Sequence, residues 1–465
     1  MVPASPESKP TTVTTSRPFL IFLAALAVRW AYVLILFAVM GEAGLKGADS
    51  VGYLELARDF AAAVATGSVH GLQWLGPSPS QMPLFTGLLL LNALVFGALA
   101  PLGYVLMQGA LDAGTCVLIA AMARSLDARY ALPAAFAAIV NPTQIVLAGL
   151  VYSDTPFVFL VALFMLASLR WMRTPQWRWA ILIGLTIGAA ALIRVMAATW
   201  LPLLALFLLA VLACERRFEL RQVGQLAVAA GIVAGLLGPV LWRNVSYYNA
   251  WALTPQGGEH LARHVVPFVK EVQDGTPRMD FIADVDRRRL ERFGAMPSNY
   301  FEQSRQYTAL GIEDLKQLGP WAAAKAWVLG AALNLGTPAI LLSPPIAQLP
   351  RTGFFATPGV SPFDKIGNFL FRSGNAAYGW ALLFGIAGVV IVRLIQLAGL
   401  VDALRQRSSR PALLLFGLWF CFVLAVSGPI ASPKYRLPLE PPLMVLAGAG
   451  LSVLQRLRRS PGGGR

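Results

Sequence analysis

The sequence contains little charge for its length. Only 13% of its 465 residues are charged, whereas 57% are hydrophobic, and the mean hydropathy is +0.62. A soluble core of this size needs more polar surface to cover it, so the composition excludes a soluble globular protein and indicates a membrane protein. Cysteine is also scarce, and the three residues Cys116, Cys214 and Cys421 are scattered. Their spacing predicts neither a disulfide nor a zinc site.

The charge that is present is mostly basic, with a formal net charge of +15. An excess of Lys and Arg can indicate nucleic-acid binding. Here, however, the basic residues lie in short clusters between apolar runs and not along one continuous face. Such clusters are typical of cytoplasmic loops that follow the positive-inside rule. We therefore expect contacts with membrane lipids and none with nucleic acid.

Ten apolar runs have the length of membrane spans. The first is expected to be a retained signal anchor after an N-terminus rich in Ser, Thr and Pro. Two other runs, 83–100 and 321–342, would place later arginine clusters outside if they crossed, so we expect them to lie at the outer interface. A count of twelve spans is the alternative. The ten runs are 19–40, 104–122, 131–151, 155–169, 179–193, 197–214, 226–241, 376–400, 412–427 and 437–454.

These features predict an all-α polytopic protein of the plasma (inner) membrane, with interfacial helices and large outer loops. The arginine clusters place both termini in the cytoplasm. We divide the chain into a disordered cytoplasmic N-terminus, an N-terminal transmembrane catalytic module that includes the first outer loop 41–82, an outer region with interfacial helices, C-terminal transmembrane helices and a basic cytoplasmic tail. The boundaries are 1–18, 19–242, 243–375, 376–455 and 456–465.

Two carboxylates lie where apolar runs meet the outer surface. Asp49 precedes the short amphipathic segment 54–60, and Asp154 follows Ser153 at the start of a span. Each of them could simply cap a helix, because the amides at a helix N-terminus favour a carboxylate. Arg194 lies between two spans on the same outer side, where the positive-inside rule disfavours arginine. The position of Arg194 therefore indicates a functional site more strongly than the position of either carboxylate does.

Further basic residues lie beside aromatic or amide residues at the outer surface. Arg243 and Asn244 end the seventh span, and Lys434, Tyr435 and Arg436 precede the last one. Such residues can anchor a protein at the membrane interface. Three outward arginines and a lysine beside two carboxylates fit a phosphorylated ligand better, because guanidinium binds phosphate oxygens in a fork geometry.

Two other polar features occur in the sequence, a pair of histidines and a carboxylate inside a span. His260 and His264 are four residues apart, which places both on one helical face, as a weak metal signal or as an ordinary polar face. Asp112 lies inside the span 104–122, where a charge costs about 2.5 to 3.5 kcal/mol on insertion scales. We expect it to face the bundle interior with a hydrogen-bond partner, in a packing role or at a ligand groove.

The order of these motifs resembles the GT-C class of polyprenyl-phosphate-sugar-dependent glycosyltransferases. The similar branch is the family 39-like one, which includes protein O-mannosyltransferases and lipid A aminoarabinose and galacturonic acid transferases. The resemblance extends over 19–454 and departs at 81–84, Gln-Met-Pro-Leu, where relatives commonly have two prolines. It implies a GT-C-like helical bundle and an inverting enzyme. Such an enzyme moves a sugar from a polyprenyl-phosphate-linked donor to a lipid, glycan or protein acceptor on the extracytoplasmic face.

The resemblance also suggests roles for individual residues. Asp49 matches the catalytic carboxylate, here a general base, and Asp154 matches a second acid that is more often Glu. A divalent metal is left open, since both carboxylates and the two histidines could supply ligands but the family has metal-independent members. The residues assigned to the donor phosphate are Arg194, Arg243, Lys434 and Arg436. Those assigned to substrate binding are Tyr53, Asn244, Tyr435 and His260.

Two other classes of function compete with the enzyme. A transporter or flippase for a lipid-linked or anionic solute could use the same cationic patch, but it predicts pseudo-symmetric halves and polar residues that continue to the inner face. The sequence shows no convincing repeat, and its polar residues gather on one side. A non-catalytic membrane scaffold would need no carboxylate at position 49. The pattern favours the enzyme.

Overall fold

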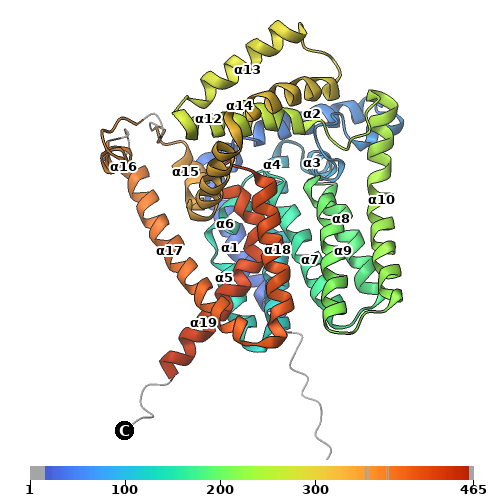
Figure 1. Cartoon of the computed structure of the whole chain (residues 1–465), viewed down its shortest axis with the longest axis vertical. Coiled ribbons are helices and arrows are strands. Elements are labelled where there is room, and N and C mark those ends of the chain that lie inside the picture. Colours follow the sequence, from blue (N-terminus) through green and yellow to red (C-terminus); the bar gives the residue numbers. More distant parts are fainter. Residues whose placement is uncertain (1–15, 351–352, 355–356, 373, 375, 460–465) are drawn as a thin grey trace, which may run out of the picture.

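The computed structural model describes residues 16–350, 353–354, 357–372, 374 and 376–459. Helices and short loops make up this part of the chain, and it contains no β-strand. Figure 1 shows long helices side by side in one bundle, with shorter helices across one end. The predicted all-α membrane fold is confirmed. The disorder predicted for 1–18 falls mostly on residues 1–15, and these, like 460–465 of the predicted basic tail, lie outside the described residues.

Eight helices in the described residues are long and apolar enough to cross a membrane. The helices α5 (Ala131–Ile139) and α6 (Pro142–Ala148), which are bent by 48° relative to each other, count as a ninth candidate span if they cross together, and α8 (Trp177–Ala191) is a shorter apolar helix. These segments correspond in sequence to the ten predicted spans. The eight long helices are α1 (Ser16–Met40), α4 (Ala100–Leu126), α7 (Asp154–Arg173), α9 (Met196–Cys214), α10 (Leu220–Tyr248), α17 (Ala376–Arg405), α18 (Arg410–Ser427) and α19 (Glu440–Arg459).

In the structure the predicted span 131–151 consists of two helices, α5 and α6, separated by a bend. α5 ends at Ile139, and α6 begins at Pro142, because proline lacks an N–H and its ring clashes with the preceding helical turn. The side chain of Asn141 caps the new helix by accepting a hydrogen bond of 2.9 Å from the backbone N–H of Thr143. The break places polar side chains in the interior of the bundle.

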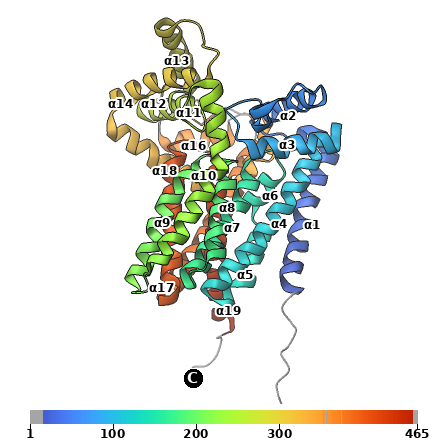
Figure 2. The same ribbon diagram turned by 90° about the vertical axis from the view of Figure 1, so that its right-hand side faces the viewer.

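A layer of shorter helices covers one end of the bundle, which we call the capped end. Figure 2 shows α3 running across this end, and the turn between α3 and α4 uses Gly97 with a φ of +53°. The interfacial position of 83–100 stays a prediction, since Pro83–Leu126 as a whole is also long and apolar enough to cross a membrane. The run 321–342 begins in α14 after a kink at Gly319, which has a φ of +82°. The helices of the layer are α2 (Ser50–Ala65), α3 (Pro83–Phe96), α11 (Gln256–His260), α12 (Val266–Asp274), α13 (Arg278–Phe293) and α14 (Tyr300–Gly336).

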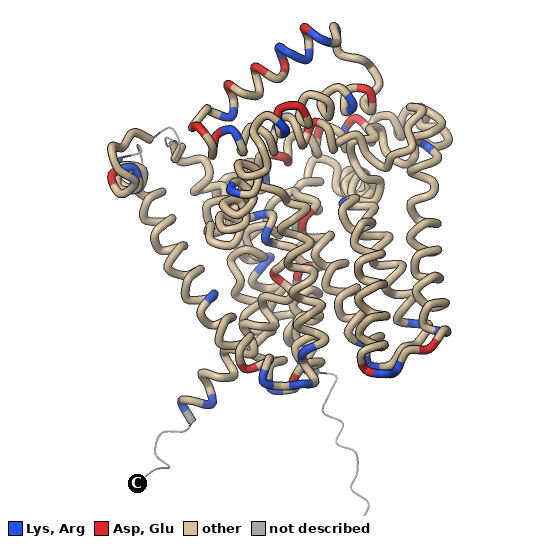
Figure 3. Tube along the Cα trace, in the orientation of Figure 1, with Lys and Arg blue, Asp and Glu red and all other residues tan. Residues whose placement is uncertain are grey.

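Three short elements follow α14, namely η6 (Ala339–Leu342), α15 (Pro344–Ala347) and α16 (Pro362–Phe371), and they lead into α17. The opposite end of the bundle, which we call the basic end, carries clustered arginines in its loops. Arg216 and Arg217 lie between α9 and α10, and Arg405 and Arg407 lie at the turn between α17 and α18. Figure 3 shows this concentration of basic residues, and α1 begins and α19 ends at the same end.

Small residues allow the helices to approach closely. A Cβ added to Gly399 on α17 would lie 2.0 Å from the carbonyl oxygen of Leu446 on α19, and one added to Gly450 would lie 1.9 Å from that of Ile395. Real side chains do not tolerate such distances, so only glycine fits at these two crossings. Close backbone approach is a common source of helix association in membranes, where the hydrophobic effect between helices is weak. It fixes α19, and with it the segment that precedes α19, against the bundle.

Candidate active site

The candidate site lies at the capped end and combines segments that are far apart in the sequence. Asp49 directly precedes α2, and Asp154 is the first residue of α7. Arg194 lies in the loop between α8 and α9, and Lys434 lies in a 3₁₀ helix, η8 (Pro433–Leu439), just before α19. The fold brings these four charged side chains into two ion pairs, one between Asp49 and Lys434 and one between Asp154 and Arg194.

Asp49 does not use its side chain to cap α2. It occupies the N-cap position, but its carboxylate makes no hydrogen bond to the helix backbone. Oδ2 of Asp49 instead accepts a hydrogen bond of 2.5 Å from Nζ of Lys434, which is 385 positions away. Ser50 secures the turn, because its Oγ accepts from the N–H of Gly47 at 2.8 Å and donates to the carbonyl of Val151 at 3.0 Å. The carboxylate of Asp49 is therefore left for the lysine.

Asp154 also fails to act as a simple cap. Its Oδ2 accepts a hydrogen bond of 2.8 Å from Nη2 of Arg194, and Nε of Arg194 donates to Oγ of Ser153 at 3.3 Å. The Asp154 side chain is only 3% exposed. Its Oδ1 is buried and has no hydrogen-bond partner among the described residues. A buried acceptor without a partner is costly, so Asp154 offers this oxygen to a ligand or to water.

Aromatic rings surround the Lys434 ammonium. Nζ of Lys434 lies 5.6 Å from the ring centroid of Tyr152 and 5.4 Å from that of Tyr435. The carbonyl of Tyr152 accepts a hydrogen bond of 2.9 Å from the hydroxyl of Tyr104, which fixes the backbone here. A Cβ on Gly47 would lie 2.0 Å from the hydroxyl oxygen of Tyr152. The position of the Tyr152 ring beside Lys434 thus requires glycine at position 47.

Tyr53 lies near both ion pairs. Burial raises the pKa of Tyr53 above its ordinary value of 10.0, so its phenol is neutral. Four nearby charges act on it as well: Arg194 lowers this pKa, Asp49 and Asp154 raise it, and Lys434 lowers it. All four charged groups of the candidate site therefore act on one phenol at the capped end.

His260 and His264 lie near Lys434, on α11 and on the π-helical turn Leu261–Val265 that follows it. Their ring centroids are 5.9 Å apart. Burial lowers the pKa of each histidine, and the charge of Lys434 lowers both further. Across the described part of the chain, no group of three or more His, Cys, Asp or Glu residues is arranged to hold a metal ion.

The two histidines predict a pH dependence of stability. Unfolded histidines take up protons as the pH falls through about 6.5, whereas His260 and His264 in the folded protein stay neutral to lower pH. The unfolded state therefore binds more protons below this value, so stability falls as the pH is lowered from about 7.5 to about 5. We expect the double variant His260→Gln, His264→Gln to show a smaller fall in thermal unfolding temperature. The exposed His70→Gln variant is the control, and equal slopes in all three proteins would contradict the prediction.

Arg243 and Asn244 lie outside the two ion pairs. Nε of Arg243 donates to Oδ1 of Asn244 at 3.0 Å, and Nη1 donates to the carbonyl of Leu75 at 2.9 Å. Asn244 in turn donates to the carbonyls of Ala252 and Leu253 at 2.7 and 3.1 Å. The Arg243 side chain is buried, and its Nη2 has no partner within the described chain. Arg243 therefore ties the end of α10 to a neighbouring loop and retains one unused donor.

Arg436 is buried just beyond Lys434, and every nitrogen of its guanidinium has a protein partner. Nε donates to Oε1 of Glu440 at 2.8 Å, and Nη2 donates to Oγ1 of Thr143 at 2.7 Å. In this structure the side chain anchors η8 to α6 and to the end of α14, and thereby positions Lys434. The predicted phosphate contact of Arg436 stays a prediction. The carbonyls that receive its Nη1 are those of Asn334, Leu335 and Thr337.

Asp112 faces the bundle interior with a partner, as predicted. Its Oδ2 accepts a hydrogen bond of 2.8 Å from Nε of Arg29 on α1, and its Oδ1 accepts one of 2.9 Å from Nε2 of Gln144 on α6. The side chains of Arg29 and Asp112 are 0% and 2% exposed. Arg29 was not among the residues predicted from the sequence, although a lone charge inside an apolar span is the signal that could have identified it.

A chain of hydrogen bonds joins this buried pair to a second one, which Arg436 and Glu440 form. Gln144 accepts a hydrogen bond of 3.3 Å from Asn141, and Asn141 donates to Oε2 of Glu440 at 2.9 Å. Glu440 is the partner of Arg436. We call the connected side chains the buried polar network. They are Arg29, Asp112, Gln144, Asn141, Glu440, Arg436 and Thr143.

No protein-family model matches the sequence, and no curated protein matches it. Solved structures are similar in fold. The archaeal oligosaccharyltransferase AglB from Archaeoglobus fulgidus, in complex with an inhibitory peptide and a dolichol-phosphate, has a TM-score of 0.51 and 16% identity over 96% of this chain and 52% of its own. This chain thus spans about half of the AglB chain.

Two structures of ArnT from Cupriavidus metallidurans are also similar. The one bound to undecaprenyl phosphate has a TM-score of 0.43 and 15% identity over 96% of this chain and 79% of its own. The apo form has a TM-score of 0.42 and 15% identity over 96% and 78%. At these identities the comparison with AglB concerns the fold alone, and it shows that the chain has the GT-C-like membrane fold that the resemblance implies.

Proposed function

We propose that the chain is a membrane glycosyltransferase that moves a sugar from a polyprenyl-phosphate-linked donor to a lipid, glycan or protein acceptor. The observation that carries this proposal is the convergence of Asp49, Lys434, Asp154 and Arg194 at one end of a GT-C-like bundle. Neither carboxylate caps its helix, so the simple structural explanation for both is absent. AglB supports the proposal because a protein of this fold is an oligosaccharyltransferase that was solved with dolichol-phosphate.

The location of the site favours a lipid-linked donor. The basic end of the bundle has the arginine clusters of a cytoplasmic face, so the capped end and its ion pairs face the other side of the plasma membrane. Nucleotide sugars are cytoplasmic in the known biology of the family. A donor whose sugar is carried on a membrane lipid can present that sugar at the extracytoplasmic face.

Asp49 is the proposed general base. It would take the proton of the acceptor hydroxyl as that oxygen forms a bond with the anomeric carbon of the donor sugar. The bond between this carbon and the phosphate oxygen breaks, and its electron pair leaves with the polyprenyl phosphate. Because phosphate is a good leaving group, no second carboxylic acid has to protonate it, in contrast to glycoside hydrolysis. Attack from the face opposite the phosphate gives inversion.

The cations of the site would stabilise the charge that develops on the leaving phosphate. Lys434 has three N–H donors, and its bond to Asp49 occupies one of them, so others are left for a phosphate oxygen. Arg194 is the second cation of the site, and it also acts on Tyr53. Arg243 would add its unpaired Nη2. Tyr53, Tyr435, Asn244 and His260 would line the substrate, and the layer within 243–375 would select the acceptor.

The test is sugar transfer from a panel of radiolabelled polyprenyl-phosphate sugars in membranes that contain the full-length protein. We expect label from one donor to appear in an acceptor fraction, and not in matched membranes without the protein. The transport alternative makes a different prediction. If labelled donor moves between leaflets and no label reaches any acceptor, the chain is a flippase and the proposed reaction is wrong.

The close contact at Gly47 gives a prediction about the Tyr152 ring beside Lys434. The Gly47→Ala variant would force Tyr152 away, because the added Cβ would lie 2.0 Å from its hydroxyl oxygen. We expect transfer to fall by about 10²-fold, the effect of misplacing a catalytic group by roughly 1 Å. Gly52→Ala is the control, since a Cβ there meets no atom within 4 Å. Equal transfer by both variants would show that the Tyr152 ring does not position Lys434.

A further inference from the structure

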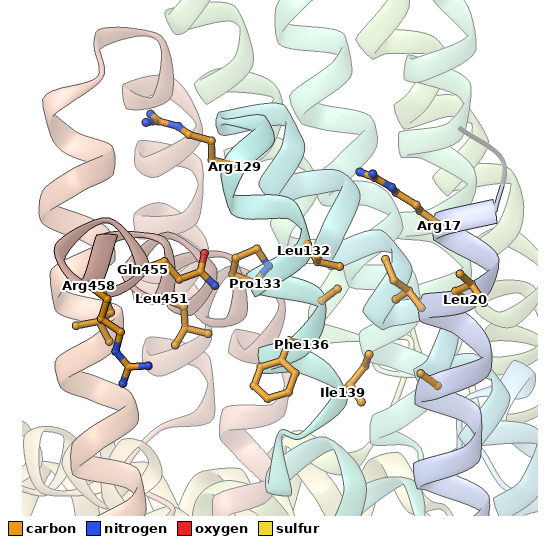
Figure 4. A pocket seen from close by; sticks show the side chains of 14 residues that line it. Arg17, Leu20, Arg129, Leu132, Pro133, Phe136, Ile139, Leu451, Gln455 and Arg458 are labelled. Carbon is orange, nitrogen blue, oxygen red and sulfur yellow. The ribbon is translucent and has the colours of Figure 1, made fainter. Parts of the chain in front are cut away.

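A cavity lies at the basic end, away from the ion pairs of the candidate site. It is about 920 Å³ in volume and lies between α1, α5 and α19. Figure 4 shows that its floor is apolar, with Leu132 and Phe136 from α5 and Leu451 from α19. Leu132 and Phe136 are 66% and 58% exposed. In a membrane, exposed side chains of this kind contact acyl chains.

The rim of this groove is basic. Arg17 on α1, Arg129 before α5 and Arg458 on α19 line it, and Figure 4 shows Arg17 extending from α1 toward α5. Arg129 is held by Asp127 at 2.6 Å. Arg17 and Arg458 have no ion pair with any described residue, so two guanidinium groups beside an apolar groove lack an anion.

We propose that this groove binds an anionic phospholipid. The phosphate would pair with an arginine of the basic rim, and one acyl chain would lie along Leu132 and Phe136. Charge complementarity favours this occupant, because guanidinium pairs with phosphate in a fork geometry and basic pockets between membrane helices recognise anionic head groups. A second copy of the chain is a poorer fit, since it would bring further arginines of this basic end to the same rim. The site is independent of the proposed transfer reaction.

The volume fits a small-molecule ligand. Pockets for such ligands are usually about 300 to 1,000 Å³, and the groove falls within that range. The chemistry requires both parts of a phospholipid, because a free phosphate would meet polar side chains only in the three arginines and Gln455, whereas the rest of the lining is apolar. A water-soluble phosphate would meet the arginines but leave the apolar floor uncovered.

The experiment measures lipid binding to the purified, delipidated full-length protein in detergent, by native mass spectrometry. The probes are phosphatidylglycerol, phosphatidylcholine with the same acyl chains, and glycerol 3-phosphate. We expect phosphatidylglycerol to bind with the highest affinity, and the double variant Arg17→Gln, Arg458→Gln to weaken its binding by about 30-fold, which is roughly fivefold for each arginine. The double variant Arg405→Gln, Arg407→Gln removes the same charge from the same end outside the groove, and it should bind as the wild type does.

Each arm can overturn the proposal. Equal binding of phosphatidylglycerol by the groove variant and by the control variant would show that these arginines do not select the lipid. Equal binding of the two phospholipids by the wild type would remove the role of charge, and comparable binding of glycerol 3-phosphate would replace the lipid with a free phosphate. The comparison of probes uses the wild type alone, so it decides the matter even if a variant fails to fold.

Discussion

Replacing Asp49 with Asn is expected to reduce sugar transfer by about 10²- to 10⁴-fold, the usual contribution of a general base. The amide keeps the size of the side chain and can still accept a hydrogen bond from Lys434, but it cannot take a proton from the acceptor hydroxyl. The effect should therefore be on transfer and not on insertion. Transfer is measured from the labelled donor identified for the wild type, with the amount of folded protein checked by monodispersity in detergent.

Asp59→Asn is the matched control for this result. Asp59 is an exposed carboxylate on the same helix, α2, ten positions from Asp49. It should transfer sugar as the wild type does. A folded Asp49→Asn protein with full activity would exclude Asp49 as the base and would leave its ion pair with Lys434 as a structural contact. A loss shared by both variants would point to the charge of α2 and not to proton transfer.

The membrane fold was predictable because hydropathy reports directly on the environment of a helix. Runs such as 19–40 and 376–400 became α1 and α17, with boundaries that differ by a few residues. Hydropathy did not show the bend within the span 131–151, where the helix breaks between Ile139 and Pro142. The mean hydropathy of that run does not report the break. The backbone groups freed by the break are satisfied by the Asn141 cap and by the surrounding helices.

The residues of the candidate site could be predicted from the sequence, but the pairs that they form could not. Asp49 and Lys434 could be singled out as polar residues beside apolar runs, but nothing local shows that they pair, because 385 positions separate them. The same limit applies to Arg436. Its neighbour Lys434 faces the site, whereas Arg436 turns inward to Glu440, and the direction of each side chain in η8 follows from tertiary packing.

The pair formed by Arg29 and Asp112 gives the largest expected effect on stability. Both side chains are buried within the bundle, and the carboxylate also accepts a hydrogen bond from Gln144. The Asp112→Leu variant would leave the Arg29 guanidinium buried without its anion. Removing one partner of a buried ion pair typically costs about 3 to 5 kcal/mol. We expect a loss of this size in the free energy of unfolding, measured by denaturant titration in mixed micelles.

The double variant Arg29→Leu, Asp112→Leu separates the energy of the pair from the cost of an unpaired charge. A hydrophobic replacement of both partners is often neutral, because it removes the desolvation of two ions together with their attraction. The double variant should therefore recover most of the stability lost in Asp112→Leu, although Gln144 loses an acceptor in both proteins. If both variants are equally unstable, the pair itself holds α1 against α4, and the buried polar network stabilises the bundle beyond neutralising its own charges.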